Sequence, residues 1–598
     1  MAADLRAYLE ARAALPLGFS PDGETVLVSS NLPGTMQLYT VPRGGGELGA
    51  LTAFAEPVTG EYLPTGNRIL LAMDEGGNER VQLSLLDPER PFAAEPLVHD
   101  PEFIHRPGGV SRDGRLLAYA CNRRNGTDFD VWVRNLESGE ERCVLAPGGW
   151  CDAVGFSPDG RWLAAVRLTE RSGDNDLLLV DLERDEFFVA SPHEDEAFLG
   201  PPAWLPGEDA FLYGTSEGRD TVGVACYELA TRRWRYVLEG EWDLEPTVDP
   251  TGTHLLVHAN EDGYSRLELR NPRTLAVTDE VPLPGRGVVT ATYFSLDGSR
   301  LVLGYTSPVV PGDVWLYDLG ERRLTRLTES PFEVEPGTLV EPELHRFASF
   351  DGESVPVLLH RPSGDAPAPV VVDIHGGPEA QRRPIFAGLA QYLVEHGFAV
   401  AMPNVRGSTG YGKRYEHLDD RHLRLDSVRD LVSLHEWLGA NGCDPARVVL
   451  YGGSYGGYMV LAGLAFHPER WAAGVDVVGI SSLVSFLENT AAWRRAFRER
   501  EYGSLEHDRE FLAEVSPLTH VDRIAAPLFI IHGANDPRVP VGQARQISAA
   551  LGERGIRCEL LVYEDEGHGL AKLANRLDAY PRAVAFLEEV LSAAPAQA

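Results

Sequence analysis

Short apolar runs with strand character follow turn signals at regular intervals through the first half of the chain. Each turn signal precedes one strand-like run, as at Glu24–Ser29 and Arg161–Val166, and a second run follows, as at Asp130–Val133. The seven signals end at Gly23, Gly66, Gly114, Gly160, Glu208, Gly252 and Gly298, so that successive ends lie 43, 48, 46, 48, 44 and 46 residues apart.

This period predicts a repeated β-sheet unit. A repeat of about 46 residues with four short strands is the size of one β-propeller blade. The Pro-Asp-Gly tips at 21–23 and 158–160 suit tight hairpins, because Pro presets φ and Gly tolerates a positive φ. Seven units predict a seven-bladed β-propeller. The alternative is a β-sandwich with common turns, which the even spacing disfavours.

The pattern changes near residue 343, where apolar runs begin to alternate with helical stretches such as Asp426–Leu438 and Gly542–Leu551. The hairpin signal at Phe350–Gly352 breaks the earlier period, and a Pro/Gly/Glu-rich linker lies at 329–342. Alternating strands and helices predict a doubly wound, mostly parallel α/β sheet. The strands are expected at 370–374, 398–402, 447–451, 473–478, 528–531 and 558–563.

We therefore expect three segments. A short amphipathic helix in residues 1–15 packs on the C-terminal domain, the propeller occupies 16–335, and the α/β domain occupies 336–598. About 150 residues per domain would have suggested four domains, but blades that share one propeller count as a single domain.

Charge and cysteine content exclude several classes of protein. The chain has 54 Lys and Arg against 89 Asp and Glu, a net charge of −35, which argues against binding to nucleic acid or to an anionic membrane. It has no apolar stretch of about 18 residues, and the acidic residues of its N-terminal segment lead us to expect no signal peptide. The six cysteines include no Cys-x-x-Cys pair, which disfavours a disulfide framework or a structural zinc site. These features predict a cytoplasmic protein without a metal or organic cofactor.

A candidate nucleophile follows the expected strand at 447–451. The segment Gly452–Gly457 contains the pattern Gly-x-Ser-x-Gly centred on Ser454, and a helical stretch comes next. This is the nucleophile elbow of α/β-hydrolases, a sharp strand-to-helix turn that exposes the serine hydroxyl. The alternative is a Gly-rich turn with an incidental serine, which the strand and helix on either side disfavour.

A serine nucleophile needs a base, and the base needs an acid that fixes its tautomer. In this fold the acid and then the histidine follow the serine along the chain. Asp536 lies 82 residues after Ser454, and His568 lies 32 residues after Asp536, each in a loop that follows a strand. Asp565 is a rival acid that we interpret as a surface charge, and we interpret His532 as a structural histidine.

The tetrahedral intermediate needs preorganised hydrogen-bond donors. The backbone N–H of Tyr455, next to the nucleophile, is one such donor by construction. The second is either a backbone N–H of the segment His375-Gly-Gly-Pro378 or the hydroxyl of Tyr411. Otherwise His375 is a structural histidine and Tyr411 is a packing residue.

Five segments of the second half carry distinctive motifs: His375–Pro378, Asn404–Gly412, Gly452–Met459, Asn535–Arg538 and Glu566–Gly569. Together they resemble the motifs of the prolyl oligopeptidase family of serine peptidases, and within it those of the acylaminoacyl peptidases. The resemblance implies that Ser454, Asp536 and His568 form the catalytic triad. It also implies that Gly377 and Tyr455 form the oxyanion hole, and Tyr411 matches the oxyanion tyrosine of prolyl oligopeptidases.

The resemblance extends to substrate binding. It implies that Arg538 binds a substrate carbonyl, and that the apolar S1 pocket is built near Phe486, Trp493 and Phe497. It also implies that the propeller admits only short peptides. The Glu-rich insertion with which dipeptidyl peptidases of the family hold a free amine is not evident, because Glu194–Glu196 is a poor substitute.

We therefore expect a serine peptidase that acts on short peptides and releases N-acylated amino acids from their N-termini. Oligopeptidase, dipeptidyl peptidase, carboxypeptidase-type and esterase activities on the same machinery remain open. The alternative outside enzymology is a propeller scaffold for protein partners with an inactive hydrolase domain. We expect a homo-oligomer, with no nucleic acid or membrane as partner.

Overall fold

The computed structural model describes residues 4–364 and 366–593, and the chain divides into two compact units. The first three residues of the expected N-terminal helix, and residues 594–598 at the end of the expected α/β domain, lie outside the described residues. One unit comprises Arg12–Glu75 and Glu79–Pro331, and the other comprises Met1–Ala11, Gly76–Asn78 and Phe332–Ala598.

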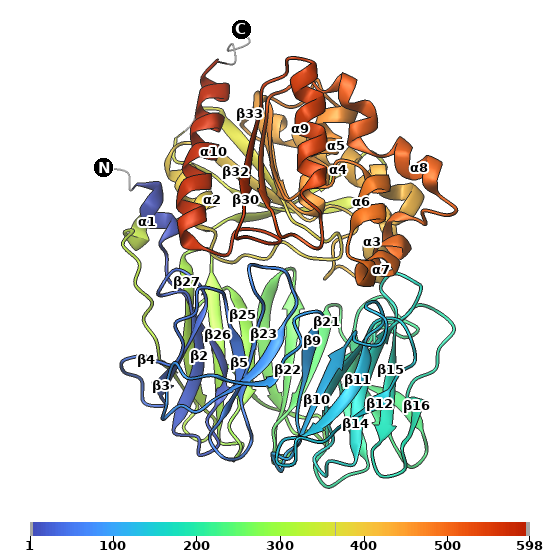
Figure 1. The fold of residues 1–598 in the computed structure, drawn as a ribbon. Helices are drawn as coiled ribbons and strands as arrows, with labels where there is room; N and C mark the ends of the chain where they lie inside the picture. Colours follow the sequence, from blue (N-terminus) through green and yellow to red (C-terminus); the bar gives the residue numbers. More distant parts are fainter. Residues whose placement is uncertain (1–3, 365, 594–598) are drawn as a thin grey trace. The chain divides into compact units, whose positions relative to one another are not determined.

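The strand-rich unit is a seven-bladed β-propeller, as the sequence predicts (Figure 1). Among the described residues it contains seven four-stranded antiparallel sheets, each built from four consecutive strands. The blades run from β1 (Ala14–Phe19) to β4 (Gly49–Ala50), β5 (Thr59–Tyr62) to β8 (Glu95–Val98), β9 (His105–Val110) to β12 (Glu141–Leu145), β13 (Cys151–Phe156) to β16 (Glu186–Val189), β17 (Ala203–Trp204) to β20 (Arg233–Leu238), β21 (Asp243–Val248) to β24 (Val277–Glu280) and β25 (Val288–Phe294) to β28 (Arg323–Arg326). The middle strands are β2 (Thr25–Ser30), β3 (Gln37–Pro42), β6 (Ile69–Met73), β7 (Gln82–Leu86), β10 (Leu116–Cys121), β11 (Asp130–Asn135), β14 (Trp162–Leu168), β15 (Asn175–Asp181), β18 (Ala210–Thr215), β19 (Gly223–Glu228), β22 (Leu255–Glu261), β23 (Tyr264–Arg270), β26 (Arg300–Ser307) and β27 (Val310–Asp318).

The repeated turn signal has a local physical cause. In the first blade the hydroxyl of Ser20 donates to Asp22 Oδ1 at 2.6 Å, and the same oxygen accepts the N–H of Glu24 at 3.0 Å. Gly23 then takes a φ of 71°, which a residue without Cβ adopts at little cost. The turn therefore closes the hairpin between β1 and β2 with side-chain hydrogen bonds. Equivalent Ser–Asp bonds recur at Ser111–Asp113, Ser157–Asp159 and Ser295–Asp297.

The C-terminal unit contains one eight-stranded sheet, and its order is β29-β30-β32-β31-β33-β34-β35-β36. The first two strands form an antiparallel hairpin around the Phe350 turn, and β30 also pairs antiparallel with β32, whereas the six strands from β32 to β36 pair in parallel. The predicted doubly wound, mostly parallel sheet is thus confirmed. Its strands are β29 (Glu343–Ala348), β30 (Ser354–His360), β31 (Ala368–Ile374), β32 (Ala399–Pro403), β33 (Cys443–Gly453), β34 (Ala473–Val477), β35 (Leu528–Gly533) and β36 (Cys558–Tyr563).

Helices cover both faces of this sheet (Figure 1). Alternate residues of the central strands enter two separate cores: Val370 and Val448 face one side, and Val371 and Val449 face the other. The first core contains α4 (Arg424–Ala440), α5 (Tyr455–Phe466) and α9 (Gly542–Glu553), and the second contains α1 (Leu5–Leu9), α2 (Gly388–Glu395) and α10 (Leu573–Ala593). The remaining helices are α3 (Lys413–Glu416), α6 (Leu483–Asn489), α7 (Ala492–Tyr502) and α8 (Arg509–Glu514).

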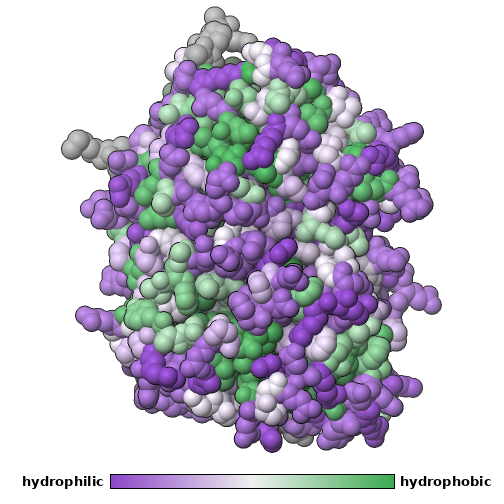
Figure 2. Space-filling model, viewed as in Figure 1, coloured by the Kyte–Doolittle hydropathy of each residue, from purple (hydrophilic) through white to green (hydrophobic). Residues whose placement is uncertain are grey.

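The surface follows the composition. Polar residues cover most of the face in Figure 2, with smaller apolar patches between them, as expected for a chain in which 24% of the residues are charged. Among the described residues, none of the helices is both long enough and apolar enough to cross a bilayer.

Candidate active site

Ser454 lies on the turn between strand β33 and helix α5, as the elbow motif predicts. Its φ of 59° and ψ of −117° are a strained combination for a residue with a side chain. The small neighbours of the turn are required sterically. A Cβ at Gly456 would lie 2.2 Å from the carbonyl oxygen of Ile374, the last residue of β31. The close approach of β31 to the elbow therefore explains the glycine two residues after the nucleophile.

Two candidate oxyanion donors lie beside Ser454. Tyr455 is the first residue of α5, so its N–H has no acceptor within the helix. The loop after β31 is the second neighbour, because a Cβ built on Gly376 would lie only 3.3 Å from Ser454 Cβ. The structure thus brings the His-Gly-Gly-Pro segment, which includes Gly377, to the nucleophile.

His375 holds this loop in place. Its Nδ1 lies 2.8 Å from the carbonyl oxygen of Gly376, and its Nε2 lies 2.8 Å from Ser408 Oγ. Burial lowers the pKa of His375 to about 4, so the ring is neutral and carries one proton. Because the carbonyl can only accept, that proton belongs on Nδ1, and Nε2 faces the Ser408 hydroxyl as an acceptor. The carbonyl of Gly376 and the N–H of Gly377 belong to the same peptide, so the bond from Nδ1 also orients the N–H.

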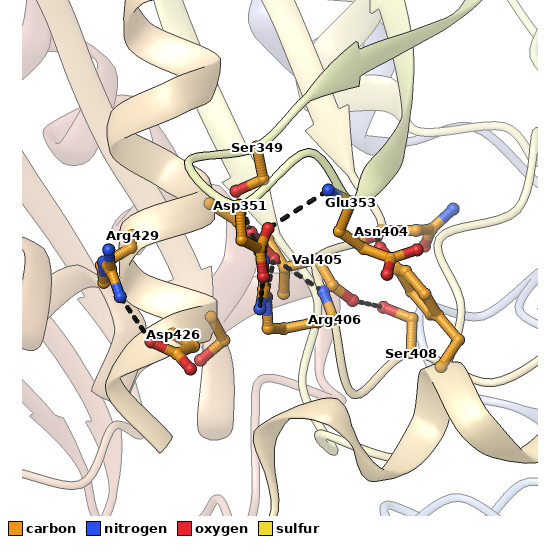
Figure 3. Close-up of polar contacts among 12 residues, drawn as sticks. Ser349, Asp351, Glu353, Asn404, Val405, Arg406, Ser408, Asp426 and Arg429 are labelled. Atoms are coloured by element: carbon orange, nitrogen blue, oxygen red, sulfur yellow. Dashed lines mark hydrogen bonds and ion pairs between the residues drawn. The ribbon is translucent and has the colours of Figure 1, made fainter. Parts of the chain in front are cut away.

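The Ser408 hydroxyl is itself anchored, since its oxygen lies 2.6 Å from the carbonyl oxygen of Val405 (Figure 3). Its single proton is thus shared between this carbonyl and His375 Nε2. The loop is fixed further by Arg406, whose guanidinium pairs with Asp430 at 2.9 Å and with Asp351 at 3.0 Å. Arg406 therefore ties the loop after β32 to helix α4 and to the hairpin of β29 and β30.

Tyr411, the other candidate for the second oxyanion donor, is held by Asn404. The side-chain amide of Asn404 donates to the Tyr411 hydroxyl at 2.8 Å. Asn404 in turn is fixed by Arg382, whose N–H donates to Asn404 Oδ1 at 2.6 Å. The hydroxyl oxygen of Tyr411 therefore has a defined position.

Asp536 and His568 lie in contact with each other. Asp536 follows β35 and His568 follows β36, and His568 Nδ1 lies 2.7 Å from Asp536 Oδ2. Asp536 Oδ1 accepts the N–H groups of Arg538 at 2.8 Å and Val539 at 3.0 Å. The Asp536 side chain is fully buried, while that of His568 is 16% exposed. The fixed carboxylate keeps the proton of the neutral ring on Nδ1, which leaves Nε2 as the basic atom.

The rival residues have structural surroundings. His532 is fully buried, and its Nε2 lies 2.8 Å from the carbonyl oxygen of Val539. Asp565 pairs with Lys572 at 3.0 Å on the surface, where its side chain is 56% exposed.

The motifs did not single out Glu566, two residues before His568, as a site residue. Glu566 is 2% exposed, and its carboxylate accepts the N–H groups of Ala571 and Lys572 at 3.0 and 2.9 Å. It also accepts from the Asn575 side chain at 2.8 Å. These bonds close the loop that carries His568. The acidic residue in the motif Glu-Gly-His-Gly is the sequence signal that could have indicated this role of Glu566.

The aromatic residues expected near the S1 pocket differ in their surroundings. Trp493 and Phe497 are half-buried on α7 beneath arginine side chains, with the Arg498 guanidinium 4.1 Å from the Phe497 ring. Phe486 is 2% exposed and packs edge-on against Tyr502 in the core.

The loop of Arg538 lies next to these helices. The hydroxyl of Thr490, between α6 and α7, donates to the Arg538 carbonyl oxygen at 2.8 Å. The segment of the expected S1 pocket and the expected carbonyl-binding arginine are therefore connected.

A buried ionic cluster lies beneath the elbow. Arg424 pairs with both Asp419 and Glu501, and the three side chains are at most 1% exposed. The Tyr455 hydroxyl donates to Asp419 Oδ2 at 2.8 Å. Asp419, Asp420 and Glu501 are close enough together to hold a metal ion. The guanidinium of Arg424 already supplies a cation to two of these carboxylates.

Residues 384–594 match the sequence pattern described as the prolyl oligopeptidase family. The chain belongs to the prolyl oligopeptidase family. It is therefore a serine peptidase, and its two domains are those expected of the family.

Relatives in this family differ in activity. Dipeptidyl aminopeptidase BIII of Pseudoxanthomonas mexicana is 28% identical over 581 residues, which cover 93% of this chain and 84% of that protein. An acylamino-acid-releasing enzyme of Arabidopsis thaliana is 26% identical over 211 residues, which cover 34% of this chain and 28% of that protein. Proteins similar to this chain therefore differ in the reaction that they catalyse.

The fold is shared over nearly the whole chain. The structure of a puromycin-hydrolysing peptidase of Mycobacterium tuberculosis has a TM-score of 0.86 at 22% identity, and the match covers 99% of this chain and 96% of that chain.

Proposed function

We propose that this protein is a serine exopeptidase that removes short units from the N-termini of peptides, with Ser454, Asp536 and His568 as its catalytic triad. The observation that carries the proposal is the 2.7 Å contact between His568 Nδ1 and Asp536 Oδ2, in a domain that displays Ser454 on a strained elbow. The contact supplies an oriented base, and the elbow supplies an accessible nucleophile.

The reaction proceeds through an acyl-enzyme. His568 Nε2 takes the proton of the Ser454 hydroxyl as its oxygen attacks the scissile carbonyl. The N–H groups of Tyr455 and Gly377 stabilise the oxyanion, and His568 then protonates the leaving amine. Water, deprotonated by His568, hydrolyses the ester by the reverse sequence of steps.

We assign Gly377 as the second oxyanion donor because its loop lies against the nucleophile. A Cβ placed on the neighbouring Gly376 would lie 3.3 Å from Ser454 Cβ. Arg538 binds a substrate carbonyl, and Trp493 and Phe497 contribute an apolar surface for the substrate side chain. The hydroxyl of Tyr411 is a further candidate hydrogen-bond donor to the oxyanion.

The first candidate substrate is a short peptide with an N-acylated terminus, from which the enzyme releases the acylated amino acid. The motifs of the catalytic domain support it, and so does the similarity to an acylamino-acid-releasing enzyme. The second candidate is a peptide with a free N-terminus that loses a dipeptide. Its support is that the similarity to a dipeptidyl aminopeptidase extends over 93% of the chain.

A reducing compartment suits the chain, because all six cysteines are free. We therefore place the enzyme in the cytoplasm.

The triad is tested by replacing Ser454. We expect the parent to be labelled at Ser454 by a fluorophosphonate and to hydrolyse a chromogenic ester, and Ser454→Ala to lose both. Ester hydrolysis that survives in Ser454→Ala, with no labelling of the parent, would overturn the assignment.

The substrate class is tested with matched peptides that carry acetylated or free N-termini and amidated or free C-termini. Mass spectrometry should detect an acetyl-amino acid from the acetylated peptides if the first candidate is right, and a dipeptide from the free peptides if the second is right. Cleavage that requires a free C-terminal carboxylate and ignores the N-terminus would contradict both.

A further inference from the structure

Helix α7 carries a charged group that reaches the oxyanion loop. Arg498 is 8% exposed, and its Nη1 donates to the carbonyl oxygen of Gly377 at 3.2 Å. The same nitrogen lies 3.5 Å from Glu379 Oε2. The guanidinium therefore connects α7 to two residues of the loop that follows β31.

Gly377 is consequently held from both sides. The peptide that carries its N–H is fixed through the Gly376 carbonyl, which accepts from His375. Its own carbonyl accepts from Arg498. Gly377 has a φ of 134°, and a Cβ there would lie 2.7 Å from the backbone nitrogen of Glu379. A glycine is free to rotate, so the two hydrogen bonds decide where its N–H points.

The same helix also reaches the other oxyanion donor. Glu501, three residues after Arg498, pairs with Arg424, and Arg424 pairs with Asp419. Asp419 accepts from the Tyr455 hydroxyl at 2.8 Å. Every side chain in this series is fully or almost fully buried. The side chain of Tyr455 is thus connected to the last turn of α7 by one hydrogen bond and two ion pairs.

We propose that Arg498 and Glu501 are positioning residues that set the two N–H groups of the oxyanion hole from a single helix. The proposal rests on the proposed function, because it assumes that Gly377 and Tyr455 are the donors. Neither residue touches the substrate. Each acts through another group: Arg498 through the Gly377 carbonyl, and Glu501 through Arg424, Asp419 and the Tyr455 hydroxyl. A donor misdirected by a fraction of an ångström stabilises the transition state less, while substrate binding is unaffected.

The first experiment compares Arg498→Met with Arg498→Lys. In Arg498→Met we expect kcat to fall about 10- to 100-fold, less than the two to three decades of losing a donor, with KM changed less than about threefold. The lysine variant keeps a charged donor and should restore most of the loss. Arg498→Met removes the cation that pairs with the half-buried Glu379, so the double variant Arg498→Met/Glu379→Gln guards against misfolding. Glu501→Gln should lower kcat in the same way.

The control is Arg509→Gln. Arg509 pairs with Glu488 on the surface, where its side chain is 56% exposed, so this ion pair connects α8 to α6 and does not involve the loop after β31. Its kcat and KM should equal those of the parent. All rates are referred to active sites counted by fluorophosphonate labelling, so that a misfolded fraction does not count as slow enzyme.

The second experiment separates positioning from general destabilisation. A peptide aldehyde forms a hemiacetal with Ser454 whose oxygen fills the oxyanion hole, whereas a product peptide does not. The affinity of the aldehyde should fall in Arg498→Met by the same factor as kcat/KM, and the affinity of the product peptide should stay the same. A role confined to folding would lower the number of labelled sites and leave both affinities unchanged.

The proposal is overturned if Arg498→Met and Glu501→Gln keep the parent's kcat and aldehyde affinity per labelled site. A parent that a fluorophosphonate does not label would instead overturn the proposed function. The two failures are therefore distinct.

Discussion

Asp476 is a carboxyl group in the interior of the catalytic sheet. It lies on β34, opposite Gly452 of the strand that leads into the elbow, and is fully buried. Helix α5 approaches it closely, since a Cβ at Gly457 would lie 2.3 Å from Asp476 Oδ1. Burial raises the pKa of Asp476 to about 7 from its ordinary value of 3.8. The folded protein therefore favours the neutral acid.

The raised pKa makes stability depend on pH through this residue. The stabilising contribution of the protonated form is complete below the unfolded pKa and is lost as pH rises through the folded value near 7. Asp476→Asn keeps the shape and removes the charge. We expect the free energy of unfolding of the variant, relative to the parent, to rise between pH 4 and 7 by up to about 1.4 kcal/mol per pH unit. Urea unfolding at pH 5, 6 and 7 measures it.

Asp565→Asn is the matched control, because Asp565 is exposed and its pKa is lowered by a hydrogen bond from Lys572. Because Asp565 changes its charge at more acid pH, the difference in free energy of unfolding between this variant and the parent should be constant from pH 5 to 7. Parallel stability curves for Asp476→Asn and the parent would contradict the assignment of a buried, titrating carboxyl.

At the scale of elements, local chemistry made the fold predictable. The Ser-x-Asp-Gly turns close their own hairpins, as the 2.6 Å bond from Ser20 to Asp22 illustrates, so their spacing along the chain indicated the blades. The chain order of Ser454, Asp536 and His568 indicated the triad in the same way, because each residue follows its own strand. The strand expected at 447–451 is longer in the structure, Cys443–Gly453. The hydrophobic pattern missed its two ends because the outer residues are less apolar.

The supports of the site were not predictable from such local patterns. Arg498 meets the Gly377 carbonyl from a position 121 residues further along the chain, and nothing in the composition of α7 distinguishes it from its neighbouring arginines. Phe486 illustrates the reverse case. From the sequence, Phe486 could line the S1 pocket or belong to the core. The structure shows that it packs against Tyr502 in the core, with 2% of its surface exposed.

At the scale of the whole molecule, the first and the last helix of the described residues, α1 and α10, pack in the same unit. Helix α1 lies in the core that contains α2 and α10, with Leu5 5% exposed and Leu9 7% exposed. The hydroxyl of Tyr8 donates to Glu395 Oε2 at 2.6 Å. The propeller is therefore inserted in the sequence between α1 and the remainder of the catalytic domain, and α1 and α10 pack in one core of that domain.

This arrangement predicts that a change far from the triad in sequence weakens the catalytic domain. Leu9→Ala should lower its free energy of unfolding by about 2–5 kcal/mol, because a buried leucine is replaced and a cavity remains. Hydrogen exchange followed by mass spectrometry should show faster exchange in α2 and α10, and unchanged exchange in propeller strands such as β10. Arg6→Ala is the control: the Arg6 side chain is 67% exposed and pairs with Glu10 of the same helical turn, so the variant should change stability by less than about 0.5 kcal/mol. Unchanged exchange in α10 of Leu9→Ala would show that the N-terminal helix adds nothing to the domain on which it packs.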